Sequence, residues 1–111
     1  PSSFTITNST STNNGTGINF EWCDNQNAVI TISENTVTNN SSEGIQSSCR
    51  MNLTVASSTV SYNGGVGIEI TRGYITGNTV SYNSASGIKV NGGGGNPYDI
   101  TNNIIVGLIS F

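Results

Sequence analysis

Short stretches of alternating apolar and polar residues recur along the whole chain. Such alternation, carried by β-branched and aromatic residues, predicts strands that bury one face. The stretches lie at residues 4–6, 30–32, 53–55, 74–76 and 98–100. Further apolar positions follow at Val37, Val60, Val80 and Ile105, and again at Ile18, Ile45, Ile68 and Ile88. The pattern therefore predicts three short strands per copy and no helix.

These strands belong to a repeat whose copies align without a gap. Four windows start with Asn or Ser and end shortly after a Gly-Ile pair, at residues 8–20, 35–47, 58–70 and 78–90, and a shorter fifth copy begins at Asn103. Strands this short pair best with the same strand in the next copy, about 4.8 Å away. We therefore expect an all-β fold, a parallel β-solenoid of about five coils, that occupies residues 1–111 as a single domain.

Asn, Ser and Gly at fixed places of the repeat are expected to build the bends between strands. An Asn at a bend tolerates left-handed backbone and can bond its amide to the neighbouring coils. The expected ladder of such bonds consists of Asn8, Asn35, Ser58, Asn78 and Asn103, and a second ladder consists of Asn13, Asn40, Asn63 and Asn83. Four repeated glycines are expected to permit a tight turn into the next strand: Gly17, Gly44, Gly67 and Gly87.

Residues 35–40 and 78–83, each followed by Gly-Ile, resemble the repeat of right-handed parallel β-helix proteins. Pectate-lyase-like enzymes, mannuronan epimerases, a periplasmic copper-binding family and many secreted or surface-layer proteins share that repeat. The resemblance runs from about residue 4 to residue 109 and implies a right-handed β-helix. It implies little about function, because the shared residues are those that build the coils.

Composition and charge narrow the range of partners. The chain carries three bases, six acids and a net charge of -3. Because nucleic-acid binding draws much of its affinity from neutralised phosphates, we expect no nucleic-acid partner. No apolar run approaches the roughly 20 residues that span a bilayer, so we expect no membrane span.

Cys23 and Cys49 are 26 residues apart (49 − 23), close to the 27 between Asn8 and Asn35 (35 − 8). Stacking of neighbouring coils would bring the two sulfurs together. We predict a disulfide, with two separate thiols as the alternative, and hence an oxidising, extracellular or cell-surface location.

The sequence offers no evident catalytic or metal-binding cluster. Its acidic residues do not fall in one register, so the carboxylate clusters of pectate-lyase-like enzymes have no counterpart, and we expect a non-enzyme. With no His, one Met and two Cys, a copper or zinc cofactor lacks ligands. Calcium at Asp24, Asn25 and Asn27 is an alternative to the simpler interpretation of a polar loop.

Two further features concern the expected surface of the solenoid. Asn14 and Asn39 begin Asn-x-Ser/Thr sequons in bends expected to face solvent, and they are the candidates for glycan attachment. Thr5, Thr31 and Thr54 begin an outward row of the kind that binds ice, but Tyr74 and Asp99 break it.

The favoured function is structural: a secreted solenoid that associates with itself into a filament, array or larger oligomer. The candidate assembly end is an apolar run that contains Ile104, Ile105, Val106, Leu108, Ile109 and Phe111. The alternative is a carbohydrate-binding module or a fragment of a secreted polysaccharide-active β-helix enzyme. Tyr62 and Tyr82 share one place of the repeat and are the candidate sugar contacts.

Overall fold

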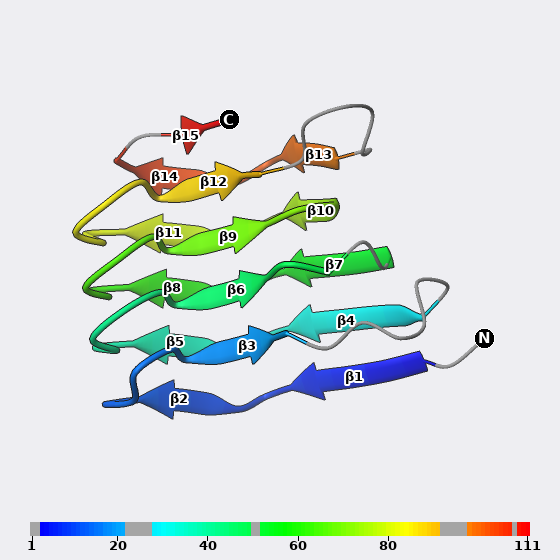
Figure 1. Ribbon diagram of the computed structural model, residues 1–111, viewed down its shortest axis with the longest axis horizontal. Helices are drawn as coiled ribbons and strands as arrows, with labels where there is room; N and C mark the ends of the chain where they lie inside the picture. Colours follow the sequence, from blue (N-terminus) through cyan, green and yellow to red (C-terminus); the bar gives the residue numbers. More distant parts are fainter. Residues whose placement is uncertain (1–2, 22–27, 50–51, 92–97, 108) are drawn as a thin grey trace.

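The chain folds into a stack of five coils. The computed structural model describes residues 3–21, 28–49, 52–91, 98–107 and 109–111. Within these residues it contains fifteen strands, three per coil, arranged in three five-stranded sheets. All described strand pairs are parallel and join neighbouring coils (Figure 1). The predicted parallel β-solenoid is confirmed.

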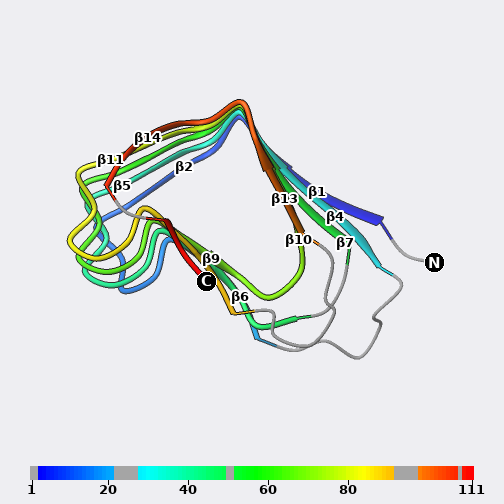
Figure 2. The same cartoon turned by 90° about the horizontal axis from the view of Figure 1, so that it is seen from above.

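Each sheet takes one strand from every coil. Sheet A contains β1 (Ser3–Thr7), β4 (Val29–Ser33), β7 (Asn52–Ala56), β10 (Gly73–Thr76) and β13 (Tyr98–Thr101). Sheet B contains β2 (Thr10–Thr12), β5 (Thr36–Thr38), β8 (Thr59–Ser61), β11 (Thr79–Ser81) and β14 (Ile104–Val106). Sheet C contains β3 (Ile18–Phe20), β6 (Ile45–Ser47), β9 (Ile68–Ile70), β12 (Ile88–Val90) and β15 (Ile109–Ser110). Seen from above, the strands of each sheet overlie one another and the three sheets surround a common interior (Figure 2).

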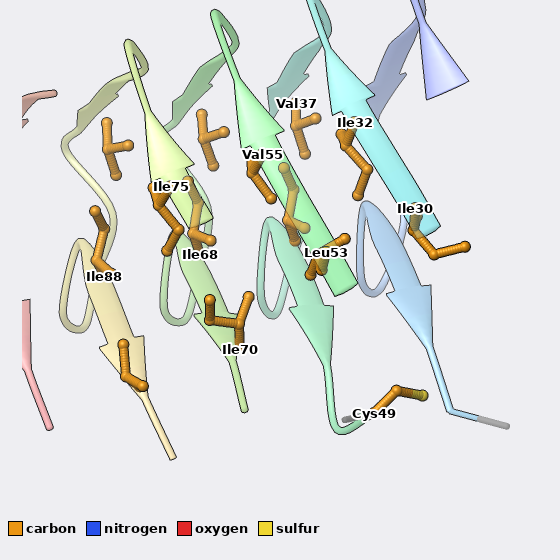
Figure 3. Packing of buried hydrophobic residues seen from close by; sticks show 14 of the residues in the cluster. Ile30, Ile32, Val37, Cys49, Leu53, Val55, Ile68, Ile70, Ile75 and Ile88 are labelled. Atoms are coloured by element: carbon orange, nitrogen blue, oxygen red, sulfur yellow. The ribbon is translucent and has the colours of Figure 1, made fainter. Parts of the chain in front are cut away.

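The core is a set of aliphatic rows that run along the stack. Ile68 pairs in register with Ile45 below and Ile88 above, and all three side chains are fully buried. Val60 lies in a matching row on sheet B. Figure 3 shows Val55, Ile68, Ile75 and Ile88 pointing into the interior from successive coils. Neighbouring coils therefore supply the burial that a single coil of three short strands could not provide.

Two rows of left-handed residues turn the chain between sheets. The bend from sheet A to sheet B uses Asn8, Glu34, Ser57, Gly77 and Asn102, with φ between 51° and 68°. The bend after sheet B uses Asn13, Asn39, Tyr62 and Tyr82, with φ between 55° and 61°. We call this second set the bend row. Asn suits such a backbone, whereas Tyr does not.

The first ladder lies directly after the A–B bend. Asn78 Nδ2 donates to the Val55 carbonyl oxygen at 2.8 Å, and Asn78 Oδ1 accepts the Ser58 N–H at 2.9 Å. Asn103 makes the equivalent bonds to coil 4, and Asn35 makes them to coil 1. The side chains thus satisfy backbone groups that the bends leave without a strand partner.

The expectation for Asn8 is wrong, because coil 1 is shifted by one residue. Thr10 pairs with Thr36, so Ser9, not Asn8, occupies the position of Asn35. Asn8 lies instead at the exposed left-handed bend. The cause is a shorter bend: Asn14 and Gly17 are separated by one residue fewer than Asn40 and Gly44.

The same shift corrects the second ladder. Its coil 1 member is Asn14, whose N–H donates to Asn40 Oδ1 at 3.0 Å, whereas Asn13 belongs to the bend row. Asn63 is the most enclosed member. Its Nδ2 donates to Val37 O at 3.2 Å and to Asn83 Oδ1 at 2.9 Å.

The repeated glycines serve close packing rather than a left-handed turn. Gly17, Gly44 and Gly67 are not among the residues with positive φ. A Cβ on Gly67 would lie 2.6 Å from the carbonyl oxygen of Gly87 and 2.8 Å from Val80 Cγ1 in the next coil. A side chain is therefore excluded by the neighbouring coil.

Candidate functional site

Tyr62 and Tyr82 form an exposed aromatic stack on coils 3 and 4. Their ring centroids lie 5.2 Å apart and the ring planes differ by 16°. The side chains are 59% and 62% exposed. The centroid distance is close to the separation of about 4.8 Å between coils, so the rings stack along the solenoid axis.

The backbone at both tyrosines is unusual. Both have positive φ, 57° at Tyr62 and 55° at Tyr82, where coils 1 and 2 carry Asn13 and Asn39. The left-handed region costs an ordinary L-residue about 1–2 kcal/mol, and Asn enters it more readily. A bulky residue held there is a structural outlier, and such outliers cluster at functional sites.

A surface pocket of about 410 Å³ adjoins the stack. It is lined by Asn39, Asn40, Tyr62, Asn63, Gly64, Tyr82 and Ser84. This lining contains aromatic rings and uncharged polar groups. Ligand pockets commonly combine aromatic side chains with a few placed polar groups, and this open depression has both.

The two outermost coils share a second aromatic feature. In coil 1, Phe4 and Phe20 are in edge contact, with centroids 6.1 Å apart at 87°. In coil 5, Tyr98 and Phe111 lie 5.5 Å apart at 40°. In each pair, one ring belongs to the first two residues of a sheet A strand. The other ring belongs to the last residue of β3 or to the residue directly after β15. We call these the end pairs.

Register shows that the end pairs occupy equivalent positions. Phe4 aligns with Ile30 and Leu53, and Tyr98 aligns with Gly73, which follows Leu53 in the same row. Phe20 and Phe111 lie at the two ends of the corresponding row of sheet C. The three inner coils carry the residue pairs Ile30 and Ser47, Leu53 and Ile70, and Gly73 and Val90. Aromatic pairs therefore distinguish coils 1 and 5 within this stack.

The residues of the predicted assembly end point in different directions. Ile104 and Val106 face outward from sheet B, where the other coils carry Thr or Ser, and they are 67% and 50% exposed. Ile105 faces inward and packs on the core. Ile109 and Phe111 occupy inward rows but remain exposed. Leu108 is outside the described residues.

Cys23, Asp24, Asn25 and Asn27 also lie outside the described residues, so the disulfide stays a prediction and the calcium alternative stays open. Cys49 is buried (Figure 3). Its Sγ lies 3.5 Å from the carbonyl oxygen of Phe20.

Three of the described acidic residues lie at different places on the coil. Glu34 is at the A–B bend, and Asp99 pairs in register with Tyr74 on sheet A. Glu69 lies on sheet C, where its Oε2 accepts a bond from Asn91 Nδ2 at 2.6 Å. Among the described residues, no three His, Cys, Asp or Glu side chains gather as a possible metal site.

The two glycan candidates differ in their surroundings. Both Asn14 and Asn39 are exposed. Asn14 Nδ2 donates to Ser11 Oγ at 3.1 Å, whereas Asn39 lies at the pocket. Glycan attachment at either residue stays a prediction.

The outward threonine row on sheet A has the predicted order. Thr5, Thr31 and Thr54 pair in register, and Tyr74 and Asp99 continue the row. Threonines therefore stop after coil 3.

A protein-family model, described as the right-handed β-helix region, matches residues 1–107 of this chain. This chain belongs to the right-handed β-helix family. No curated protein and no solved structure matches it. Over the part of the β-helix that the structure describes, no helix is long and apolar enough to cross a membrane.

Sequence reasoning found the tyrosine stack but missed the end pairs. The alternating stretches placed Tyr74 beside Tyr98, whereas the observed register pairs Tyr98 with Gly73. Tyr74 consequently faces outward and Tyr98 inward. Alignment of Phe4 with Tyr98 across the intervening coils is the signal that would have revealed the pairs.

Proposed function

We propose that this β-helix is a non-catalytic structural module that associates end to end with further copies of itself. The end pairs carry the proposal. Phe4 is 50% exposed, Tyr98 is 45% exposed and Phe111 is 75% exposed, although all three occupy inward rows. Apolar surface of this kind favours contact with a matching surface.

Strand direction makes the two end coils compatible. The strands β1, β2 and β3 form one edge of the described sheets, and β13, β14 and β15 form the other. Every described pairing between coils is parallel and in register. A second copy placed on coil 5 would extend all three sheets in the same direction, and its Phe4 and Phe20 would face Tyr98 and Phe111.

The first ladder offers a specific bond for that contact. Ser58 Oγ donates to Ala56 O at 3.0 Å and accepts the Asn35 N–H at 3.1 Å from the coil before it. Ser9 Oγ makes the same donor bond, to Thr7 O at 3.1 Å. In the proposed contact, Ser9 accepts the Asn103 N–H of the preceding copy, as Ser58 does for Asn35.

A contact between unlike ends that continues the stack along the solenoid axis does not bring the two free ends together, so association would give open filaments. The non-catalytic part of the proposal rests on the dispersed acidic residues. The proposed location, extracellular or at the cell surface, rests on the predicted disulfide between Cys23 and Cys49.

Two variants test the end-to-end contact. Phe4→Asp blocks the coil 1 end, and Phe111→Asp blocks the coil 5 end, because each places a charge in an apolar contact. Sedimentation velocity over increasing concentration is expected to show growing oligomers for the native chain and monomers for each variant alone. An equal mixture retains one intact end of each kind and is expected to give a discrete dimer.

The matched control is Tyr74→Asp. Tyr74 is 50% exposed, the same fraction as Phe4, but faces outward from sheet A. This variant should associate like the native chain. A native chain that stays monomeric at the highest concentration, or a mixture that gives no dimer, contradicts the proposal.

A further inference from the structure

The bend row changes its chemistry between coils 2 and 3. It carries Asn13 and Asn39, then Tyr62 and Tyr82, all with the same left-handed backbone. Asn would suit all four positions better than Tyr. The tyrosines therefore occupy positions where their backbone is disfavoured, and their rings gain little burial in return, since more than half of each side chain is exposed.

The outer faces of the stacked pair are not covered by another ring of the row. Toward coil 2, the row continues with Asn39, whose side chain is shorter than tyrosine. Toward coil 5, the residue after the Ser81 and Val106 pair is Gly107, which has no side chain. A flat ligand can approach these faces without displacing a neighbouring aromatic ring.

The pocket beside the stack supplies uncharged polar groups. Asn40 and Asn63 use their amides in the second ladder. Asn39 and Ser84 are the polar side chains of the lining that this ladder does not use. The lining contains no charged side chain, so it offers no counter-charge to a uronate or a phosphate.

We propose that Tyr62, Tyr82 and Asn39 form a binding site for neutral pyranose sugars. The C–H face of a pyranose packs against the electron-rich face of a tyrosine, and sugar hydroxyls bond to Asn39 and Ser84. The two rings cover each other's inner faces, so each tyrosine offers one outer face to a sugar. The site lies on the bend after sheet B and does not involve the end pairs.

The decisive variants are Tyr62→Asn and Tyr82→Asn. Each restores the residue type that coils 1 and 2 use at this bend, so the fold is retained and the thermal midpoint is expected to stay level or rise. The probes are neutral β-1,4-linked gluco-, manno- and xylo-oligosaccharides, with an oligogalacturonate of equal length for comparison. Calorimetry on protein from a host without N-glycosylation is expected to detect at least one neutral ligand, bound about tenfold more weakly by each variant.

The matched control is Tyr74→Thr, which extends the threonine row of sheet A and lies away from the pocket. It should bind the sugar like the native chain. Three results overturn the proposal: no neutral oligosaccharide binds, the oligogalacturonate binds best, or Tyr62→Asn and Tyr82→Asn both bind the sugar unchanged. A fall in the thermal midpoint of Tyr62→Asn without any sugar binding would assign the stack to stability alone.

Discussion

Coils 1 and 3 follow the same three-strand plan but differ sharply in burial. In coil 3, Leu53, Val55 and Ile68 are fully buried. In coil 1, the equivalent residues Phe4, Ile6 and Ile18 are all partly exposed. The residues are similarly apolar in both coils, so the difference comes from the number of neighbouring coils. Position in the stack, more than local sequence, determines how much each side chain contributes to stability.

A second contrast concerns the sheet B interior. Coils 2 to 4 place Val37, Val60 and Val80 there, whereas coil 1 places Ser11. The Ser11 hydroxyl donates to the carbonyl oxygen of Gly17 at 2.7 Å. Coil 1 therefore replaces part of the aliphatic core by a local hydrogen bond.

The largest expected effect is a truncation within the isoleucine row of sheet C. Ile68→Ala in coil 3 should lower the free energy of unfolding by about 4 kcal/mol, because neighbours on both sides retain the cavity. Ile18→Ala in coil 1 should cost about 2 kcal/mol, because its side chain is already partly exposed. Urea denaturation of both variants measures the difference. Equal losses would show that the stack does not create the burial gradient.

Alanine substitutions at two glycines, one in coil 3 and one in coil 1, should change the stability of the fold in opposite directions. Gly67→Ala is expected to destabilise by about 2 kcal/mol, since its new Cβ would lie 2.6 Å from the Gly87 carbonyl oxygen. Gly15→Ala in coil 1 meets nothing within 4 Å and should stabilise by up to about 0.5 kcal/mol through the unfolded chain. Thermal midpoints compare the two. The close-packing explanation fails if Gly67→Ala is neutral.

The smallest effect is expected in the second ladder. Asn63→Ala in coil 3 removes buried bonds to Val37 O and Asn83 Oδ1 and should cost about 1.5 kcal/mol. Asn14→Ala in coil 1 removes an exposed bond to Ser11 Oγ and should cost about 0.5 kcal/mol. Hydrogen exchange of the backbone N–H of Asn40, which donates to Asn63 Oδ1, provides the local measurement. Unchanged protection of that amide in Asn63→Ala would contradict the role assigned to the ladder.

The solenoid was predictable because its repeat is marked by positions at which the packing of neighbouring coils permits few other residues. Ile18, Ile45 and Ile68 each follow a glycine that the next coil leaves no room to replace, so the Gly-Ile pair marks sheet C reliably. The one-residue shift of coil 1 was not predictable from that mark. Because the bend before Gly17 is one residue shorter, the coil 1 strands of sheets A and B lie one residue closer in sequence to the Gly-Ile pair. Only the observed strand pairing locates this change.

The tyrosine stack could be found from its repeated position, but its physical cost could not. A tyrosine gives no sequence signal for a left-handed backbone, unlike the asparagine at the same bend one coil earlier, Asn39. The positive φ of Tyr62 is therefore visible only in the structure. The pocket depends on side chains from three coils and emerges only after they are stacked.

The ladders also have a direction that relates to synthesis. Each acceptor oxygen of the first ladder takes a backbone N–H from the preceding coil: Asn35 from Ser9, Ser58 from Asn35, and so on to Asn103 from Asn78. A coil consequently lacks its last bend partners until the next coil has been made. A chain that emerges from the ribosome N-terminus first meets this need in order. The order in which the coils are synthesised matches the direction of these hydrogen bonds, so each newly made coil supplies the acceptor oxygen that the preceding coil lacks.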